Sequence, residues 1–209
     1  MYPEWCSARV LSTAWCEGQS FEDFLASAPT QAARDRFGAA LYRFYLGTVY
    51  RHGLFNADPH PGNLLFAPDG RLVILDYGCV REFDPGTVAK LAHLSAAVRG
   101  GDLEAMRQAL VALGARDPGP KGFGPAAELL RGFYAPVLRP GRRRMEGGIG
   151  LAMREVIAKK RSVARLRLPG KLLFLFRIRF GLYAVLSRLG AEVDWQALEE
   201  QLVSEARAG

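Results

Sequence analysis

Three polar side chains, Asp58, Asn63 and Asp76, each stand next to a glycine or proline or one residue away from one. They are separated by five residues and then by thirteen. Carboxylate and amide oxygens are hard ligands of the kind that Mg²⁺ binds. A carboxylate within hydrogen-bond reach can also accept or orient a proton. Asp-Pro and Pro-Gly pairs form ordinary turns as well, but turns alone do not require these residues at this spacing. The pattern therefore favours a site that binds a divalent cation and handles a proton.

An expected β-hairpin holds these side chains at fixed positions. Its strands are the apolar runs 64–66 and 72–75, and Ala67-Pro68-Asp69-Gly70 joins them. Proline presets one turn dihedral and Gly70 can take the positive one, so we assign Asp69 to the turn alone. The hairpin thus brings the end of the loop with Asn63 close to the beginning of the segment with Asp76.

The order Asp-x-x-x-x-Asn followed by Asp-x-Gly is the layout of a kinase catalytic loop and its metal-binding element. In that layout Asn63 and Asp76 hold the metal ion that bridges the phosphates, and Asp58 accepts or orients the proton of the attacking hydroxyl or water. NADPHPGN followed by DYGCVREF resembles the UbiB/AarF family of atypical kinases, which includes the ADCK and Coq-type proteins. Two residues depart from the family pattern. Asn56 replaces His or Gln, which leaves open how the loop is braced, and Tyr77 replaces Phe.

The resemblance implies ATP and magnesium as cofactors, and a protein-kinase-like C-lobe with extra C-terminal helices over residues 20–209. Residues 1–19 would be a remnant of the last N-lobe strand and the hinge. The phosphate loop, strand lysine and partner glutamate of a complete kinase are not found before this hinge. The N-lobe is therefore largely absent, and we expect either a longer gene product or a separate N-lobe polypeptide as a partner.

The same resemblance implies which residues contact the nucleotide. Residues 9–15 are predicted to form a strand, with Trp15 as a wall of the adenine pocket. The alternative is an ordinary strand with Trp15 in the core. His60, between two prolines, is expected to shape the loop rather than to bind a ligand. The expected nucleotide-binding residues are Ala14, Trp15, Cys16, Glu17, Leu65 and Asp76.

Hydrophobic residues at three- and four-residue steps, together with N-cap residues, predict helices along the rest of the chain. Thr30 is expected to cap a long helix that ends at Gly53 and leads into the loop. Asp84, Asp102 and Asp194 are the expected caps of later helices. The predicted fold class is mainly α with a small β-hairpin. The expected helices span residues 20–27, 30–52, 86–99, 102–113, 125–134, 149–160, 169–189 and 194–207.

Length and composition fit one domain, because 209 residues with 49% hydrophobic content can bury a core. Cys6, Cys16 and Cys79 have neither an even count nor a paired metal-ligand spacing. We therefore expect reduced thiols rather than disulfides, and a buried position for Cys79.

The start of the chain, Met1-Tyr2-Pro3-Glu4, lacks the basic and apolar regions of a signal peptide. The longest apolar run, residues 172–186, contains Arg177 and Arg179 and is too short to span a bilayer. The sequence therefore predicts a cytoplasmic protein, soluble or peripheral at a membrane, without a transmembrane helix.

Basic residues are concentrated in the last part of the chain. Residues 1–130 contain 12 Lys and Arg against 14 Asp and Glu, whereas residues 131–209 contain 16 against 7. This favours an anionic partner such as a membrane surface or lipid, although solvated helix faces would give the same pattern. No aromatic residues interleave the cluster, so no specific nucleic acid is expected. The cluster consists of Arg142, Arg143, Arg144, Lys159, Lys160 and Arg161.

The family resemblance implies an ATP-dependent kinase or ATPase that supports ubiquinone, or isoprenoid quinone, biosynthesis. A second reading is a small-molecule phosphotransferase of the aminoglycoside or choline type, which Gly78 and Arg81 disfavour. A third reading is a non-catalytic pseudokinase or lipid-binding scaffold, which the missing N-lobe favours.

Overall fold

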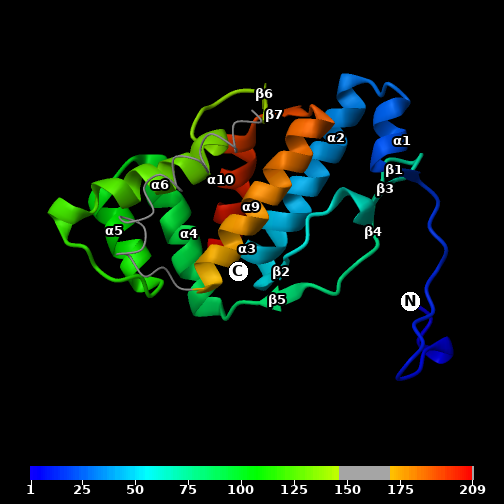
Figure 1. Ribbon diagram of the computed structural model, residues 1–209, viewed down its shortest axis with the longest axis horizontal. Coiled ribbons are helices and arrows are strands. Elements are labelled where there is room, and N and C mark those ends of the chain that lie inside the picture. The colour runs from blue at the N-terminus through cyan, green and yellow to red at the C-terminus, as the bar shows by residue number, and fades with distance from the viewer. Residues whose placement is uncertain (146–169, 209) are drawn as a thin grey trace.

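The computed structural model describes residues 1–145 and 170–208, and most of this part of the chain is helical (Figure 1). The predicted helix at 149–160 lies outside the described residues. The other predicted helices are present, with ends that differ by a few residues. The helices are α1 (Phe21–Ala26), α2 (Gln31–Tyr42), α3 (Thr48–His52), α4 (Pro85–Gly100), α5 (Leu103–Ala112), α6 (Gly124–Tyr134), α9 (Gly170–Leu189) and α10 (Trp195–Ala208).

The predicted hairpin is formed by β3 (Leu64–Phe66) and β4 (Leu72–Ile74), which pair antiparallel. Gly70 has a φ of 87°, which glycine adopts without steric cost. A third strand, β1 (Gln19–Ser20), adds to the other edge of β3 and pairs Ser20 with Leu65. This pairing was not predicted, because two residues carry no alternation that sequence reasoning can detect.

A second antiparallel ribbon joins the segments before and after the predicted site. It consists of β2 (Leu54–Asn56) and β5 (Val80–Glu82), and Asn56 pairs with Val80. At its outer end, the amide of Phe83 donates to the carbonyl of Gly53 at 2.7 Å. The ribbon therefore ties the two ends of the loop-and-hairpin segment together. A third short pair, β6 (Arg143–Arg144) with β7 (Glu192–Val193), lies far from it in the sequence.

The prediction of a strand over residues 9–15 is wrong. In this segment the only regular pairing in the described residues is a single bridge between Ser7 and Val10, and Trp15 is 90% exposed. The alternative with Trp15 in the core is therefore wrong as well. A strand needs a partner for its backbone groups, and the chain runs past the hairpin without pairing until Gln19 (Figure 1).

The long helix predicted before the loop is confirmed, but it contains a π turn, η2 (Arg43–Gly47), between α2 and α3. Thr30 caps its start by accepting from the amide of Ala33 at 3.2 Å. Gly53 ends it in the left-handed region, with a φ of 67°. This helix leads directly into β2 and then into the loop that carries Asp58.

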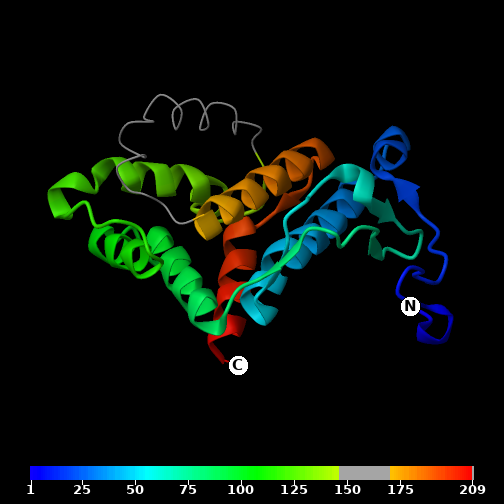
Figure 2. The same ribbon diagram turned by 60° about the horizontal axis from the view of Figure 1, so that its bottom comes forward.

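The helices form two arms that meet at α10 (Figure 2). One arm contains α4, α5 and α6, and the other contains α2 and α3 with the hairpin beyond them. Helix α10 contacts both α3 and α4. Asp84 and Asp102 cap α4 and α5 as predicted, since their side chains accept from amides in the first turn.

Where the arms meet, a buried ion pair joins α9 to α10. Arg179 and Glu199 are 1% and 0% exposed and pair directly. Glu199 also accepts from the hydroxyls of Tyr42 at 2.5 Å, Ser95 at 2.9 Å and Tyr50 at 3.0 Å. Burial alone would raise the pKa of Glu199, but the charge of Arg179 and these hydrogen bonds outweigh it and hold that pKa below its usual value.

Candidate functional site

The structure brings the side chains of Asp58 and Asn63 into contact. Nδ2 of Asn63 donates to Oδ2 of Asp58 at 3.1 Å. Between them, His60 shapes the loop as predicted, because its Nδ1 accepts from the amide of Gly62 at 3.0 Å. A 3₁₀ turn, η3 (Pro61–Asn63), then leads into β3. Since the amide nitrogen of Asn63 faces Asp58, its Oδ1 is the atom that suits a metal ion.

Asp76 reaches the loop through its backbone. The amide of Leu75 donates to the carbonyl of Asn63 at 2.9 Å, which places the end of β4 beside the loop. The Asp76 carboxylate is exposed, and its Oδ1 accepts from the amide of Gly78 at 2.6 Å. In the described part of the chain, no group of three or more His, Cys, Asp or Glu side chains could hold a metal ion. A metal site here would therefore need the amide oxygen of Asn63 as well as the carboxylates.

Asn56 braces the two halves of this site. It is 4% exposed, and its Nδ2 donates to the carbonyl of Asp76 at 2.8 Å. Its Oδ1 accepts from the amide of Asp58 at 3.0 Å. The backbone amide of Ala57 also donates to the carbonyl of Cys79 at 3.0 Å. The residue that departs from the family pattern thus links the backbone of the loop to that of the Asp-Tyr-Gly turn. Cys79 itself is exposed, so the prediction of a buried thiol is wrong.

Two further residues support the loop from the helices, and the sequence analysis did not select either of them. Tyr45, in the π turn, is 1% exposed and lies beneath Asp58. Burial raises the pKa of its hydroxyl, and the negative charge of Asp58 adds to this effect. Gly181, in α9, lies against Pro59. An isolated glycine inside an apolar helix was a usable signal for Gly181, whereas nothing in the sequence marks the π turn.

The predicted nucleotide-binding residues fall into two groups. Leu65 is partly buried in the middle of β3, and a β-carbon added to Gly18 would lie 3.0 Å from its Cβ. The end of the predicted hinge therefore adjoins the hairpin. In contrast, Ala14, Trp15 and Glu17 are exposed and Cys16 is only partly buried, so the described residues do not enclose them.

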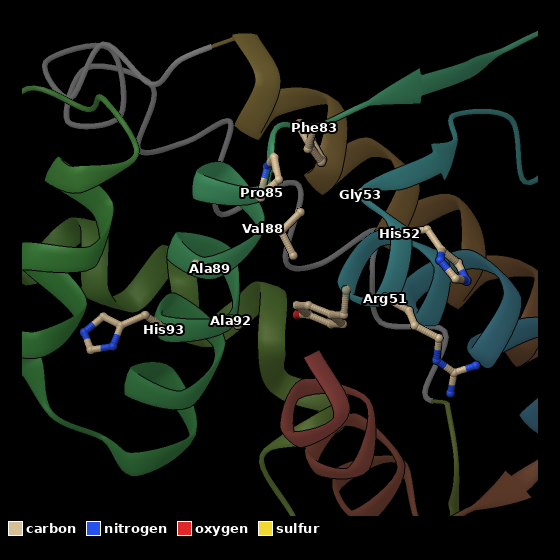
Figure 3. A pocket seen from close by; sticks show the side chains of 10 residues that line it. Arg51, His52, Gly53, Phe83, Pro85, Val88, Ala89, Ala92 and His93 are labelled. Carbon is tan, nitrogen blue, oxygen red and sulfur yellow. The ribbon is translucent and has the colours of Figure 1, made fainter. Parts of the chain in front are cut away.

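A cavity of about 740 Å³ lies elsewhere, between the end of α3 and the beginning of α4 (Figure 3). Phe83, Val88 and Ala92 form part of its apolar wall, and His52 and His93 lie on opposite sides of it. None of the predicted site residues lines it. Its lining also lacks carboxylate and carboxamide side chains, so it does not supply the oxygen ligands that a metal-bound phosphate needs.

An Asp-x-x-x-x-Asn loop and an Asp-x-Gly turn, joined by a short hairpin on a helical body, define a kinase-like class of protein. A comparison of folds agrees with the architecture. The structure is similar to that of Rv3197 from Mycobacterium tuberculosis, which was solved in complex with erythromycin. The TM-score is 0.67 with 23% sequence identity, and the match covers 92% of this chain and 49% of that one.

The particular family follows from the sequence comparison. Residues 1–110 match the model of the ABC1 atypical kinase-like domain, so the chain belongs to this family, which is the UbiB/AarF family. ACTIVITY OF BC1 COMPLEX KINASE 3, a chloroplastic protein of Arabidopsis thaliana, is 32% identical over 137 residues. That match covers 65% of this chain and 19% of the relative. An uncharacterized protein of Synechocystis is 33% identical over 116 residues, which is 55% of this chain and 20% of the relative. The chain thus spans about a fifth of the length of these relatives.

Proposed function

We propose that this chain is the C-lobe of an atypical kinase, and that it supports ATP- and magnesium-dependent phosphoryl transfer or ATP hydrolysis. The observation that carries the proposal is the contact between Asp58 and Asn63 at 3.1 Å, with Asn56 bracing the loop against Asp76. These are the groups that a kinase-like site needs, and hydrogen bonds to the backbone join the segments that carry them at the open end of one hairpin.

Each side chain has a defined role in the proposal. Oδ1 of Asn63 and the carboxylate of Asp76 would hold magnesium, which neutralises charge on the phosphates when it is bound. Asp58 would accept or orient the proton of the attacking hydroxyl or water. The hydrogen bond from Asn63 fixes one carboxylate oxygen of Asp58, which leaves Oδ1 to face the nucleophile.

The nucleotide would bind between this site and an N-lobe, with Leu65 and residues Ala14 to Glu17 on the C-lobe side. Apolar side chains exposed on this side support such a partner: Leu75 is 54%, Tyr77 58% and Trp15 90% exposed. Burial of these apolar side chains against an N-lobe would be favourable. The N-lobe would come from a longer form of the protein or from a separate polypeptide, in keeping with the greater length of the relatives.

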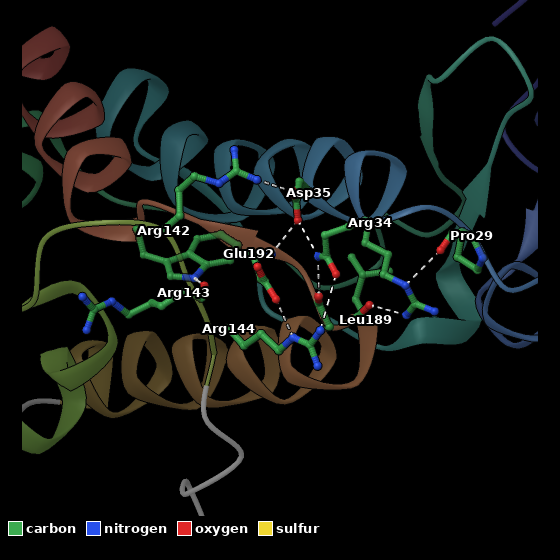
Figure 4. Close-up of polar contacts among 11 residues, drawn as sticks. Pro29, Arg34, Asp35, Arg142, Arg143, Arg144, Leu189 and Glu192 are labelled. Atoms are coloured by element: carbon green, nitrogen blue, oxygen red, sulfur yellow. Dashed lines mark hydrogen bonds and ion pairs between the residues drawn. The ribbon is translucent and has the colours of Figure 1, made fainter.

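We further propose a role in isoprenoid quinone (ubiquinone) biosynthesis, in the cytoplasm and at a membrane surface. Relatives whose names refer to the bc1 complex support the quinone role. No helix in the described residues has the length and apolar character needed to cross a bilayer. Part of the basic cluster is engaged internally, because Arg142 pairs with Asp35 and Arg144 pairs with Glu192 at 2.9 Å (Figure 4). Electrostatic attraction would therefore depend on other basic residues; Lys159, Lys160 and Arg161 lie outside the described part.

The metal assignment can be tested by titration with Mn²⁺ and ATP in a form of the protein that includes an N-lobe, followed by the electron paramagnetic resonance signal of free Mn²⁺. We expect Asp76→Ala to weaken binding by roughly a hundredfold or more, since even groups that only support a ligand are worth about 10–100-fold. The matched control is Asp69→Ala. This carboxylate lies at the tip of the same hairpin and pairs with Arg71 at 2.6 Å. Unchanged binding in Asp76→Ala would refute the assignment.

The complex of the structural relative with erythromycin favours one further candidate, a small-molecule phosphotransferase. A screen of hydroxylated small molecules for phosphate acceptance distinguishes it from the leading proposal. A third candidate is a non-catalytic scaffold, which the exposure of Ala14, Trp15 and Glu17 favours, since the described residues do not enclose these predicted nucleotide-binding positions. ATP hydrolysis by the purified chain above background, lost in Asp58→Asn, would exclude the scaffold.

A further inference from the structure

Helix α9 touches the loop beside Asp58 through a glycine. A β-carbon added to Gly181 would lie 2.5 Å from Cγ of Pro59 and 3.4 Å from its Cδ. These atoms belong to a closed ring, which cannot swing aside as the end of a flexible side chain can. Glycine weakens the interior of a helix, but at this position it allows α9 to pack directly against the loop.

The π turn provides a second support. Turns of this kind are rare and are often found at functional sites. The hydroxyl of Tyr45 donates to the carbonyl of Asp58 at 3.4 Å, which is a long hydrogen bond. The preceding residue, Phe44, packs edge-on against Tyr77, with ring centroids 6.4 Å apart. Two successive aromatic residues therefore reach the loop and the Asp-Tyr-Gly turn from the same turn of helix.

Helix α9 is itself held firmly near the contact. Arg179, two residues before Gly181, pairs with Glu199 of α10. It also donates to the hydroxyl of Tyr183, two residues after Gly181, at 2.8 Å. The side chains of Arg179 and Tyr183 are both buried. The glycine that faces Pro59 therefore lies on a part of the helix that is fixed on both sides.

We propose that Gly181, Phe44 and Tyr45 form a loop clamp, which positions Asp58 by holding its backbone. This rests on the proposed function of the loop. The three are positioning residues, because they contact the backbone of Asp58, the ring of Pro59 and the side chain of Tyr77 rather than the reacting atoms. The clamp leaves the carboxylate of Asp58 to interact with Asn63.

Hydrogen exchange of the ligand-free chain, resolved by mass spectrometry, tests the clamp directly. In Gly181→Ala we expect the amides of residues 57–66 to exchange about tenfold faster or more, because local opening of the loop becomes easier. The matched control is Gly132→Ala in α6, an exposed helical glycine at which no atom of the described residues lies within 4 Å of the added carbon. Both variants gain the same helix propensity, so a difference between them isolates the contact with Pro59.

A second variant tests the same contact by compensation. Pro59→Ala removes the ring atoms that the added carbon would meet. In the double variant Gly181→Ala/Pro59→Ala, we expect loop exchange to return to within about threefold of Pro59→Ala alone, which is the coupling of two residues in contact. Exchange in the double variant that is much more than threefold faster than in Pro59→Ala alone would contradict the proposal.

Binding of Mn²⁺ with ATP adds a readout that depends on the proposed function. We expect Gly181→Ala to weaken it about tenfold, since small displacements at a reacting centre have large effects, and Gly132→Ala to leave it unchanged. If the unaltered chain does not bind Mn²⁺ with ATP when an N-lobe is present, the proposed function fails, while loop exchange still decides the clamp. The clamp would be overturned if the loop of Gly181→Ala exchanged at the wild-type rate. It would also be overturned if Gly181→Ala and Gly132→Ala changed loop exchange equally.

If Gly181→Ala does not fold, Tyr45→Phe is the test variant in its place. This substitution removes only a hydroxyl and should leave the fold intact. We expect loop exchange to rise about two- to fivefold, in line with the loss of a single hydrogen bond. Unchanged loop exchange in a folded Tyr45→Phe chain would then count against the clamp.

Discussion

The carboxamide of Asn56 is the smallest unit that connects both halves of the candidate site. One side-chain amide uses its acceptor for the loop and its donor for the turn after β4. A buried amide with both functions satisfied stabilises a single arrangement of the two segments. Its position suits asparagine, whose short side chain spans the gap between the two backbones.

We predict that Asn56→Ala destabilises the chain by about 1–3 kcal/mol, because it leaves a backbone donor and a backbone acceptor without their partners. The free energy of unfolding, from urea denaturation, gives the measurement. Gln108→Ala is the control, since this amide lies at the surface of α5 and bonds only to Glu104. A loss no larger than that of the control would show that the brace contributes nothing.

Spacing alone was enough to predict that Asp58 and Asn63 lie together, since five residues with two prolines leave the loop few conformations. The brace by Asn56 could not be predicted in the same way. Its partners are a backbone amide and a backbone carbonyl, which nearly every residue has, so the sequence does not mark them. The exposure of Trp15 was missed for a related reason, because an aromatic residue in an apolar run reads as buried whether or not a partner covers it.

Among the elements, the β2–β5 ribbon depends on how α3 ends. Gly53 takes a φ of 67°, and a β-carbon there would lie 2.5 Å from the carbonyl oxygen of Phe83. This carbonyl cannot move without disturbing the ribbon, since the amide of the same residue bonds to Gly53. The close approach therefore fixes where the ribbon begins.

Gly53→Ala should lower the free energy of unfolding more than Gly101→Ala. Gly101 caps the C-terminal end of α4, as Gly53 does for α3. Both glycines have a left-handed φ, 67° and 74°, so the backbone cost of about 1–2 kcal/mol is shared. Of the two, only Gly53 has an atom of the described residues within 4 Å of the added carbon. The difference in urea unfolding free energy between the variants measures the contact with the ribbon, and equal losses would rule that contact out.

Elements with strong local signals were predicted correctly. The β3–β4 hairpin has Pro68 and Gly70 in its turn, and the long helix has Thr30 as its cap. Residues 9–15 had strand-like composition but no partner strand in the described chain. The π turn could not have been predicted, since no residue in Arg43–Gly47 marks it in the sequence.

At the scale of the whole molecule, the buried pair of Arg179 and Glu199 holds the two arms together. It joins α9 and α10, and hydroxyls from α2, α3 and α4 complete it. Removal of one partner of such a pair leaves an uncompensated charge in the core, which costs about 3–5 kcal/mol. Replacement of both partners by apolar residues has a far smaller effect.

We therefore expect Glu199→Gln to lower the free energy of unfolding by about 3–5 kcal/mol, and Glu200→Gln to change it little. Glu200 is the adjacent residue on α10 and is 53% exposed. An Arg179→Met/Glu199→Leu double variant should recover most of the loss. Similar stability of Glu199→Gln and Glu200→Gln in chemical denaturation would contradict this account.

The same pair gives the stability a pH dependence. The pKa of Glu199 is lower in the folded chain than its ordinary value of 4.5. The stabilisation is therefore complete above that pH and is lost as the pH falls through the lower, folded-state value. Denaturation curves between about pH 3 and 7 should show this loss in the wild-type chain and a weaker one in the double variant. If the free energy of unfolding changed equally with pH in the two proteins, Glu199 would be excluded as the source of the pH dependence.

The β2–β5 ribbon has one more consequence. It pairs the residues just before Asp58 with those just after Asp76, so both carboxylates belong to a single closed excursion of the chain. Fraying of this stem would free both ends of the segment that carries Asp58, Asn63 and Asp76 in one event. We therefore expect the proposed site to be lost as a unit when the six paired residues of the ribbon open, to an extent set by their opening free energy.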